Sequence, residues 1–124
     1  MWRSTSRSPR RPRACWATPN GDEEFIFNAR IRDDGIVLVD RKLPHRAIEQ
    51  AALPINGIID FDSPMTKSQF TAETRQLYDW SVNHKPECRF HVLLFNDTTK
   101  LTSSKDGDEM RLAIEGHFYK AEAK

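Results

Sequence analysis

Three side chains that commonly bind zinc fall within eight residues of this chain. His84, Cys88 and His91 have the spacing His-x₃-Cys-x₂-His, and Pro86 lies between them. Imidazole nitrogen and thiolate sulfur are preferred zinc ligands, and a proline holds the connecting loop bent. His117 is a candidate fourth ligand if its segment forms a neighbouring strand. As one alternative, the pattern therefore predicts a small module stabilised by zinc.

A second group of charged residues has the types needed for metal-dependent hydrolysis of a phosphodiester. Asp40 and Lys42 follow the apolar run 36–39, and Asp22 lies 18 residues before Asp40. Over residues 22–50 this arrangement resembles the core of the PD-(D/E)xK nucleases. The resemblance implies that Asp22 and Asp40 bind Mg²⁺, while Lys42 orients or deprotonates the attacking water. A Mg-dependent nuclease is therefore a second alternative.

Charge is distributed unevenly between an N-terminal arm and the rest of the chain. Residues 1–20 carry five arginines and no acid, whereas residues 21–124 carry 14 basic and 18 acidic residues, a net charge of −4. Guanidinium groups neutralise phosphates, and Trp2 and Trp16 can stack on unpaired bases. We expect any contact with nucleic acid or another polyanion to use the arm's arginines, which are Arg3, Arg7, Arg10, Arg11 and Arg13.

The common motifs of nucleotide-dependent enzymes and hydrolases do not occur in the sequence. There is no Gly-x₄-Gly-Lys phosphate loop, no Gly-x-Gly-x-x-Gly, no Gly-x-Ser-x-Gly and no His-Glu-x-x-His. No apolar run approaches the ~18 residues that cross a bilayer. We therefore expect a small soluble, non-catalytic binding or interaction protein, adaptor-like or inhibitor-like. We expect a protein as its main partner, with no membrane contact and no cofactor.

The two cysteines are divided between the arm and the body, at Cys15 and Cys88. A flexible tail and a folded body make a poor disulfide framework, so we expect free thiols in a reducing compartment and a cytoplasmic protein. The arm is also rich in Arg and Ser and free of acids, as organellar transit peptides are. Mitochondrial or other organellar import through residues 1–20 is therefore the alternative, although Pro9 and Pro12 would break the helix of a transit peptide.

Composition and turn signals divide the chain into an arm and one folded unit. Residues 1–21 are rich in Arg, Ser and Pro and lack apolar periodicity, which predicts a disordered basic arm. Asn20-Gly21 is a turn signal at its end. Residues 22–124 are long enough for one small domain.

Hydrophobic periodicity predicts strands and helices within residues 22–124. Alternation over 25–31, the turn signal Asp33-Asp34-Gly35 and the apolar run that opens 36–42 predict a β-hairpin. Pro44 then begins a short helix, and 55–61 has the pattern of a third strand. Thr66 and Gln69 form a capping box for a helix that ends before Pro86.

The C-terminal part predicts further strands. Residues 90–95 are a strong central strand, and 98–103 can pair back against it. Residues 109–121 alternate like a strand but have the composition of a helix, and we favour the strand. The expected fold is α+β: a single small domain with a mixed or antiparallel sheet of about five strands and two helices packed on one face.

Overall fold

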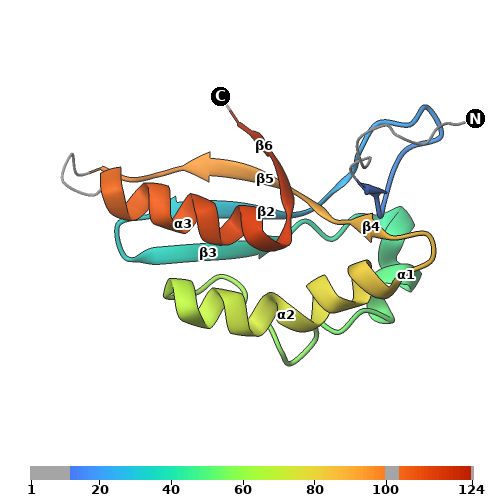
Figure 1. Cartoon of the computed structure of the whole chain (residues 1–124), viewed down its shortest axis with the longest axis horizontal. Coiled ribbons are helices and arrows are strands. Elements are labelled where there is room, and N and C mark those ends of the chain that lie inside the picture. The colour runs from blue at the N-terminus through green and yellow to red at the C-terminus, as the bar shows by residue number, and fades with distance from the viewer. Residues whose placement is uncertain (1–11, 100–103, 124) are drawn as a thin grey trace, which may run out of the picture.

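The chain folds as one small α+β domain in the computed structural model, which describes residues 12–99 and 104–123 (Figure 1). The described residues form a four-stranded sheet, a two-stranded sheet and three α-helices, which confirms the predicted class. In chain order the elements are β1 (Arg13–Ala14), β2 (Phe25–Arg32), β3 (Gly35–Asp40), a 3₁₀ helix (Pro44–Arg46), α1 (Ala47–Ala51), α2 (Lys67–Asn83), β4 (Cys88–Arg89), β5 (His91–Asn96), α3 (Ser104–His117) and β6 (Tyr119–Glu122).

The main sheet has the strand order β3-β2-β5-β6. Its first two strands form the predicted antiparallel hairpin, in which Ile31 lies opposite Ile36 and Arg32 opposite Gly35. β5 runs parallel to both of its neighbours, so the sheet is mixed. The smaller sheet pairs β1 with β4 in parallel over two residues each.

α2 and α3 lie next to each other and cover one face of the main sheet (Figure 1). On that face Phe27 of β2 contacts Phe118, which follows α3, with ring centroids 6.1 Å apart. Phe118 in turn contacts Phe70 of α2, also at 6.1 Å. Side chains at alternate positions of β2, such as Asn28 and Arg30, are only half-buried because they point to the opposite face. Two helices therefore pack on one face, but they are α2 and α3, whereas the sequence predicted α2 and the short helix that begins at Pro44.

α2 begins as the sequence predicts. The Thr66 hydroxyl accepts a hydrogen bond from the Gln69 amide at 3.0 Å, which satisfies one of the free donors of the first turn. Phe70 and Leu77 are fully buried on the inner side of the helix. Within residues 12–99 and 104–123, no helix combines the length and apolar character needed to cross a bilayer.

The preference for a strand over 109–121 is wrong, because most of this segment belongs to α3. A strand would place Leu112 and Ile114 on the same face, yet Leu112 is 66% exposed and Ile114 is fully buried. The Glu, Met, Arg, Leu and Ala residues of the segment have high helix propensity, which outweighs the apolar alternation and Gly116. A short strand, β6, follows only from Tyr119 onward.

The predicted strand at 55–61 is also wrong. Its apolar residues Ile55 and Ile59 are buried through successive turns, in which the amide of Ile59 donates to the carbonyl of Ile55 at 3.1 Å. Gly57 has a φ of 74°, a left-handed conformation that a regular strand does not contain. The sequence also suggested that 98–103 pairs back as a strand. Residues 98–99 do not form a strand, and residues 100–103 lie outside the described residues.

The N-terminal boundary at residue 21 and the prediction of free thiols are both corrected by the structure. Cys15 and Cys88 form a disulfide, and β1 pairs with β4 beside it. Trp16 is only 5% exposed and meets Phe90 edge-on at 5.6 Å. Residues 12–21 therefore belong to the folded domain, while residues 1–11 of the predicted arm lie outside the described residues. No local pattern in the chain indicates a bridge between cysteines 73 positions apart.

Candidate functional site

The residues of the nuclease alternative make their hydrogen bonds with separate local neighbours. Asp40, at the end of β3, accepts hydrogen bonds from the Lys42 amide and from the Gln50 side chain, both at 2.8 Å. Asp22 lies in an exposed turn closed by Thr18, whose hydroxyl accepts a hydrogen bond from the Asp22 amide at 3.2 Å. The described residues contain no group of three or more His, Cys, Asp or Glu side chains placed to hold a metal ion. The Mg²⁺ site stays a prediction.

The four candidate zinc ligands make different contacts. Cys88 is bonded to Cys15, so its sulfur can serve as a thiolate ligand only in the reduced chain. The ring of His84 hydrogen-bonds to the carbonyl of Pro86 at 2.9 Å. His91 and His117 instead belong to a series of contacting ring and arginine side chains, described next.

Three ring side chains lie in register across the main sheet, each at the first residue of its strand. Phe25 of β2 lies opposite His91 of β5, which lies opposite Tyr119 of β6. The ring centroids of Phe25 and His91 are 6.4 Å apart, and those of His91 and Tyr119 are 5.3 Å apart. All three residues are half-buried.

Two arginines and two further rings extend this series on both sides. The guanidinium of Arg41 lies 6.0 Å from the Phe25 ring. At the other end Arg89 lies 5.2 Å from the Tyr119 ring and 4.9 Å from the Tyr78 ring. Such distances are typical of cation–π contacts. Tyr78 then stacks on His117 at 4.6 Å. We call this set the aromatic–arginine row: Arg41, Phe25, His91, Tyr119, Arg89, Tyr78 and His117.

His117 ends the row as a neutral ring. Thr74 donates its hydroxyl proton to the carbonyl of Phe70, so at 2.8 Å it must accept a proton from Nδ1 of His117. Burial lowers the pKa of His117, and the positive charge of Arg75 lowers it further. The imidazole therefore stacks on Tyr78 without carrying a charge at neutral pH.

A groove of about 460 Å³ borders the row. One wall comes from the N-terminal segment, where Arg13 is exposed, and the other includes His91, Tyr119 and Lys120. A hydrogen bond to Glu122 raises the pKa of Lys120, so its ammonium group stays charged at neutral pH. Arg3, Arg7, Arg10 and Arg11, the other candidate nucleic-acid ligands, lie outside the described residues and precede this wall in the sequence.

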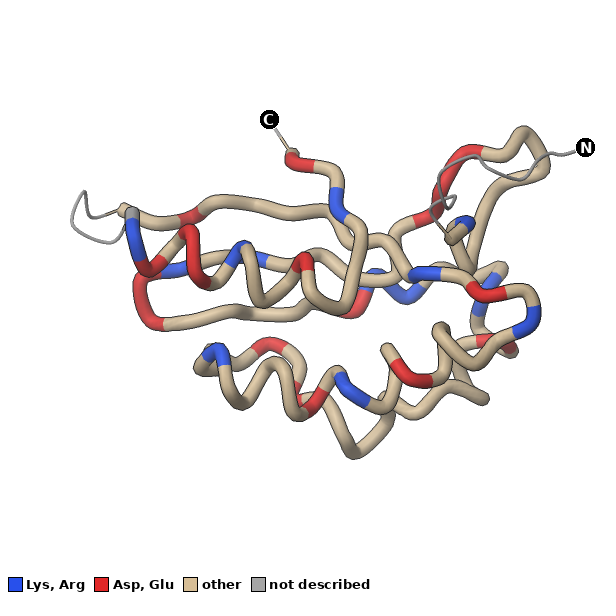
Figure 2. The backbone as a smooth tube through the Cα atoms, viewed as in Figure 1, with Lys and Arg blue, Asp and Glu red and all other residues tan. Residues whose placement is uncertain are grey.

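Charge on the rest of the molecule is mixed. Basic and acidic residues alternate along the backbone rather than gathering on opposite sides (Figure 2). One further arginine–aromatic pair lies on the sheet face away from the helices, where the guanidinium of Arg30 is 4.2 Å from the Phe95 ring. Arg30 also forms an ion pair with Asp97 at 2.9 Å. Local contacts between arginines and rings, not a large basic field, therefore distinguish this surface.

An ionic cluster around the half-buried Glu24 and Arg46 fixes the N-terminal segment beside the groove. Arg46 donates to Glu24 at 2.8 Å and to the carbonyl of Ala17 at 3.0 Å, and its guanidinium lies 5.4 Å from the Trp16 ring. His45 also hydrogen-bonds to Glu24. Burial works to raise the pKa of Glu24, but the hydrogen bonds from His45 and Arg46 outweigh it and hold the pKa below its usual value.

Sequence reasoning did not identify the row, although part of its signal was present. The predicted strands at 25–31 and 90–95 each have a ring side chain near their start. The third strand start, at Tyr119, was hidden because its segment was assigned to a longer strand. The contacts of Arg89 and Tyr78 depend on how α2 packs, which the sequence pattern does not specify.

The chain matches no protein-family model, no curated protein and no solved structure.

Proposed function

We propose that the chain is a non-catalytic binding protein that holds single-stranded nucleic acid on the aromatic–arginine row. Unpaired bases stack on aromatic rings and on guanidinium planes, and the row contains both kinds of group in one continuous series. Its half-buried rings, at the starts of three adjacent strands, are the observation that carries the proposal.

The groove beside the row is lined by one acid, Glu23, and by cationic side chains that suit the phosphates of such a ligand. Arg13 and Lys120 stand in the walls of the groove, and Arg41 is exposed at the far end of the row. The other four arginines of the N-terminal arm add positive charge that precedes the groove wall. A duplex would hide its bases from the rings, so the proposal specifies single strands and little choice of sequence.

The first test is a fluorescence anisotropy titration of labelled oligouridine of about 12 nucleotides, within the usual site sizes for single strands. Tyr119→Leu removes the ring while keeping an apolar side chain, and Tyr119→Phe is its matched control. We expect the leucine variant to bind about 5-fold to 150-fold more weakly, from the ~1–3 kcal/mol that one stacked base contributes. The phenylalanine variant should bind like the wild type.

Arginine variants test the contact with phosphates. Arg41→Ala should weaken binding and flatten the dependence of log K on log salt by about 0.7, the contribution of one phosphate contact on a single strand. Arg75→Ala is the control, because Arg75 is an exposed arginine on the helical layer. Equal losses in both variants, or no binding by the wild type at low salt, would refute the proposal. Shortening of the oligonucleotide in Mg²⁺ but not in EDTA would favour the nuclease alternative instead.

A further inference from the structure

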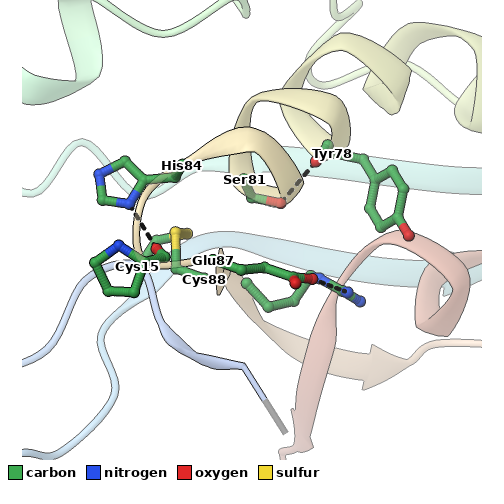
Figure 3. The surroundings of a disulfide bond; sticks show 8 residues. Cys15, Tyr78, Ser81, His84, Glu87 and Cys88 are labelled. Atoms are coloured by element: carbon green, nitrogen blue, oxygen red, sulfur yellow. Dashed lines mark hydrogen bonds and ion pairs between the residues drawn. A yellow bond between two sulfur atoms is a disulfide. The ribbon is translucent and has the colours of Figure 1, made fainter.

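The disulfide attaches one wall of the groove to the main body of the domain (Figure 3). Residues 12–14 form part of that wall. Besides the disulfide, they are held by the two-residue pairing of β1 with β4, and the Cys15 amide donates to the carbonyl of Arg89 at 3.0 Å. So few backbone contacts give this stretch a low local stability once the covalent link is removed.

A second cavity borders the disulfide. This cavity, of about 450 Å³, is lined by both cysteines together with Arg13, Arg46 and His84. Cys15 is half-buried, whereas Cys88 is only 2% exposed, so Cys15 is the more exposed residue of the pair. The cationic side chains in the lining favour an approaching thiolate and also the thiolate that leaves.

We propose that the Cys15–Cys88 disulfide is a redox-controlled latch on the nucleic-acid groove, an inference that rests on the proposed function. A thiolate of a dithiol reductant attacks Sγ of Cys15, and the sulfur–sulfur bond breaks. Cys88 leaves as a thiolate and takes up a proton. The second thiol of the reductant then attacks its partner sulfur in the mixed disulfide and releases Cys15 as a thiol. Two electrons and two protons pass to the protein, and the reductant becomes a disulfide.

Release is confined to the residues before Trp16. Trp16 is buried, its carbonyl accepts a hydrogen bond from the Glu24 amide at 3.0 Å, and Arg46 holds the next carbonyl, that of Ala17. These contacts do not depend on the disulfide. Reduction therefore frees residues 12–15, which include Arg13 of the groove wall, and leaves the rest of the domain folded.

The test compares oxidised and dithiothreitol-reduced protein by hydrogen exchange and by oligouridine binding. Reduction should speed amide exchange in residues 12–15 while β2 and β5 stay protected. It should also raise the Kd for oligouridine at least about fivefold, the lower end of ordinary coupling between sites. By linkage, saturating oligouridine should make the disulfide harder to reduce at equilibrium by the same factor. The double variant Cys15→Ser, Cys88→Ser should bind like the reduced protein and should not respond to dithiothreitol.

Each measurement in this test has an outcome that would overturn the proposal of a redox latch. Reduction that proceeds only in urea would show that the disulfide is not accessible in the folded protein. Exchange that rises throughout β2 and β5 would show general unfolding instead of local release. Equal Kd values for oligouridine before and after reduction would show that the disulfide does not affect binding. If neither form binds oligouridine, the proposed function fails, while the exchange and reduction measurements still decide whether the segment is released.

Discussion

Replacing Arg46 should lower the free energy of unfolding more than replacing most other residues near the surface. Its guanidinium donates to Glu24, Glu49 and the carbonyl of Ala17, and it covers the ring of Trp16. The Arg46 side chain is 19% exposed and that of Glu24 is 12% exposed, so water can replace little of this hydrogen bonding. Arg46→Met removes the charged group and keeps the apolar stem, which isolates the ionic contribution.

The expected loss in the free energy of unfolding is about 2–3 kcal/mol. Removing one partner of a fully buried ion pair costs ~3–5 kcal/mol because the other charge stays buried and unpaired. Partial exposure and the remaining contact of Glu24 with His45 reduce that figure. The measurement is urea unfolding followed by tryptophan fluorescence, with Glu24→Gln completing a double-mutant cycle whose coupling energy should be about 1–2 kcal/mol.

The control for this prediction is Arg75→Met on α2. The Arg75 side chain is 64% exposed and lies 3.6 Å from Asp79, so its loss should cost less than ~1 kcal/mol. An Arg46→Met protein as stable as this control would refute the proposed role of the cluster.

Acid pH gives a second check on the same cluster. The folded-state pKa of Glu24 is depressed, so its contribution is present above the unfolded pKa and is lost as the pH falls through the folded value. The difference in stability between wild type and Arg46→Met should therefore shrink in acid. A difference that is constant with pH would contradict this reasoning.

Three further predictions concern other parts of the fold. Replacing Cys15 and Cys88 by serine should lower the free energy of unfolding by about 4 kcal/mol, because the bridge closes a loop across a sequence separation of 73; unchanged urea midpoints would contradict this. Gly35→Ala should lower the free energy of unfolding by about 2–3 kcal/mol, because φ is 140° and a Cβ would lie 2.6 Å from the Met65 carbonyl oxygen. Gly116→Ala is its control, since a Cβ there meets no neighbour within 4 Å. Thermal melts should show that this second variant is as stable as the wild type or more stable. The depressed pKa of His117 means that the unfolded chain binds more protons, so stability should fall as the pH drops below ~6.5. His117→Asn should flatten that part of the pH profile of urea unfolding.

Local sequence signals were enough to predict the elements that depend on local chemistry. The hairpin follows from alternation and from a turn sequence that tolerates positive φ, and both lie within residues 25–40. The start of α2 follows from the Thr66 hydroxyl and Gln69. These features need no information about distant parts of the chain.

The errors arose where distant contacts decide the structure. Residues 12–17 have no periodicity of their own, and contacts with distant residues, such as Trp16 with Phe90 and Cys15 with Cys88, hold them in the fold. At 109–117 apolar alternation and helix propensity conflicted, and packing of Ile114 against the core favoured the helix. The candidate site shares this dependence, since its row joins residues from β2, β4, β5, β6 and both long helices.

The central claim is that nucleic acid binds on the aromatic–arginine row, and amide chemical shifts test it most directly. ¹⁵N-labelled protein would be titrated with unlabelled oligouridine, and shift changes would be mapped onto the assigned backbone. The account predicts the largest changes at Phe25, His91 and Tyr119, with smaller ones at Arg13 and Arg41. Changes confined to the exposed side of α2, or none at saturating oligouridine, would contradict it.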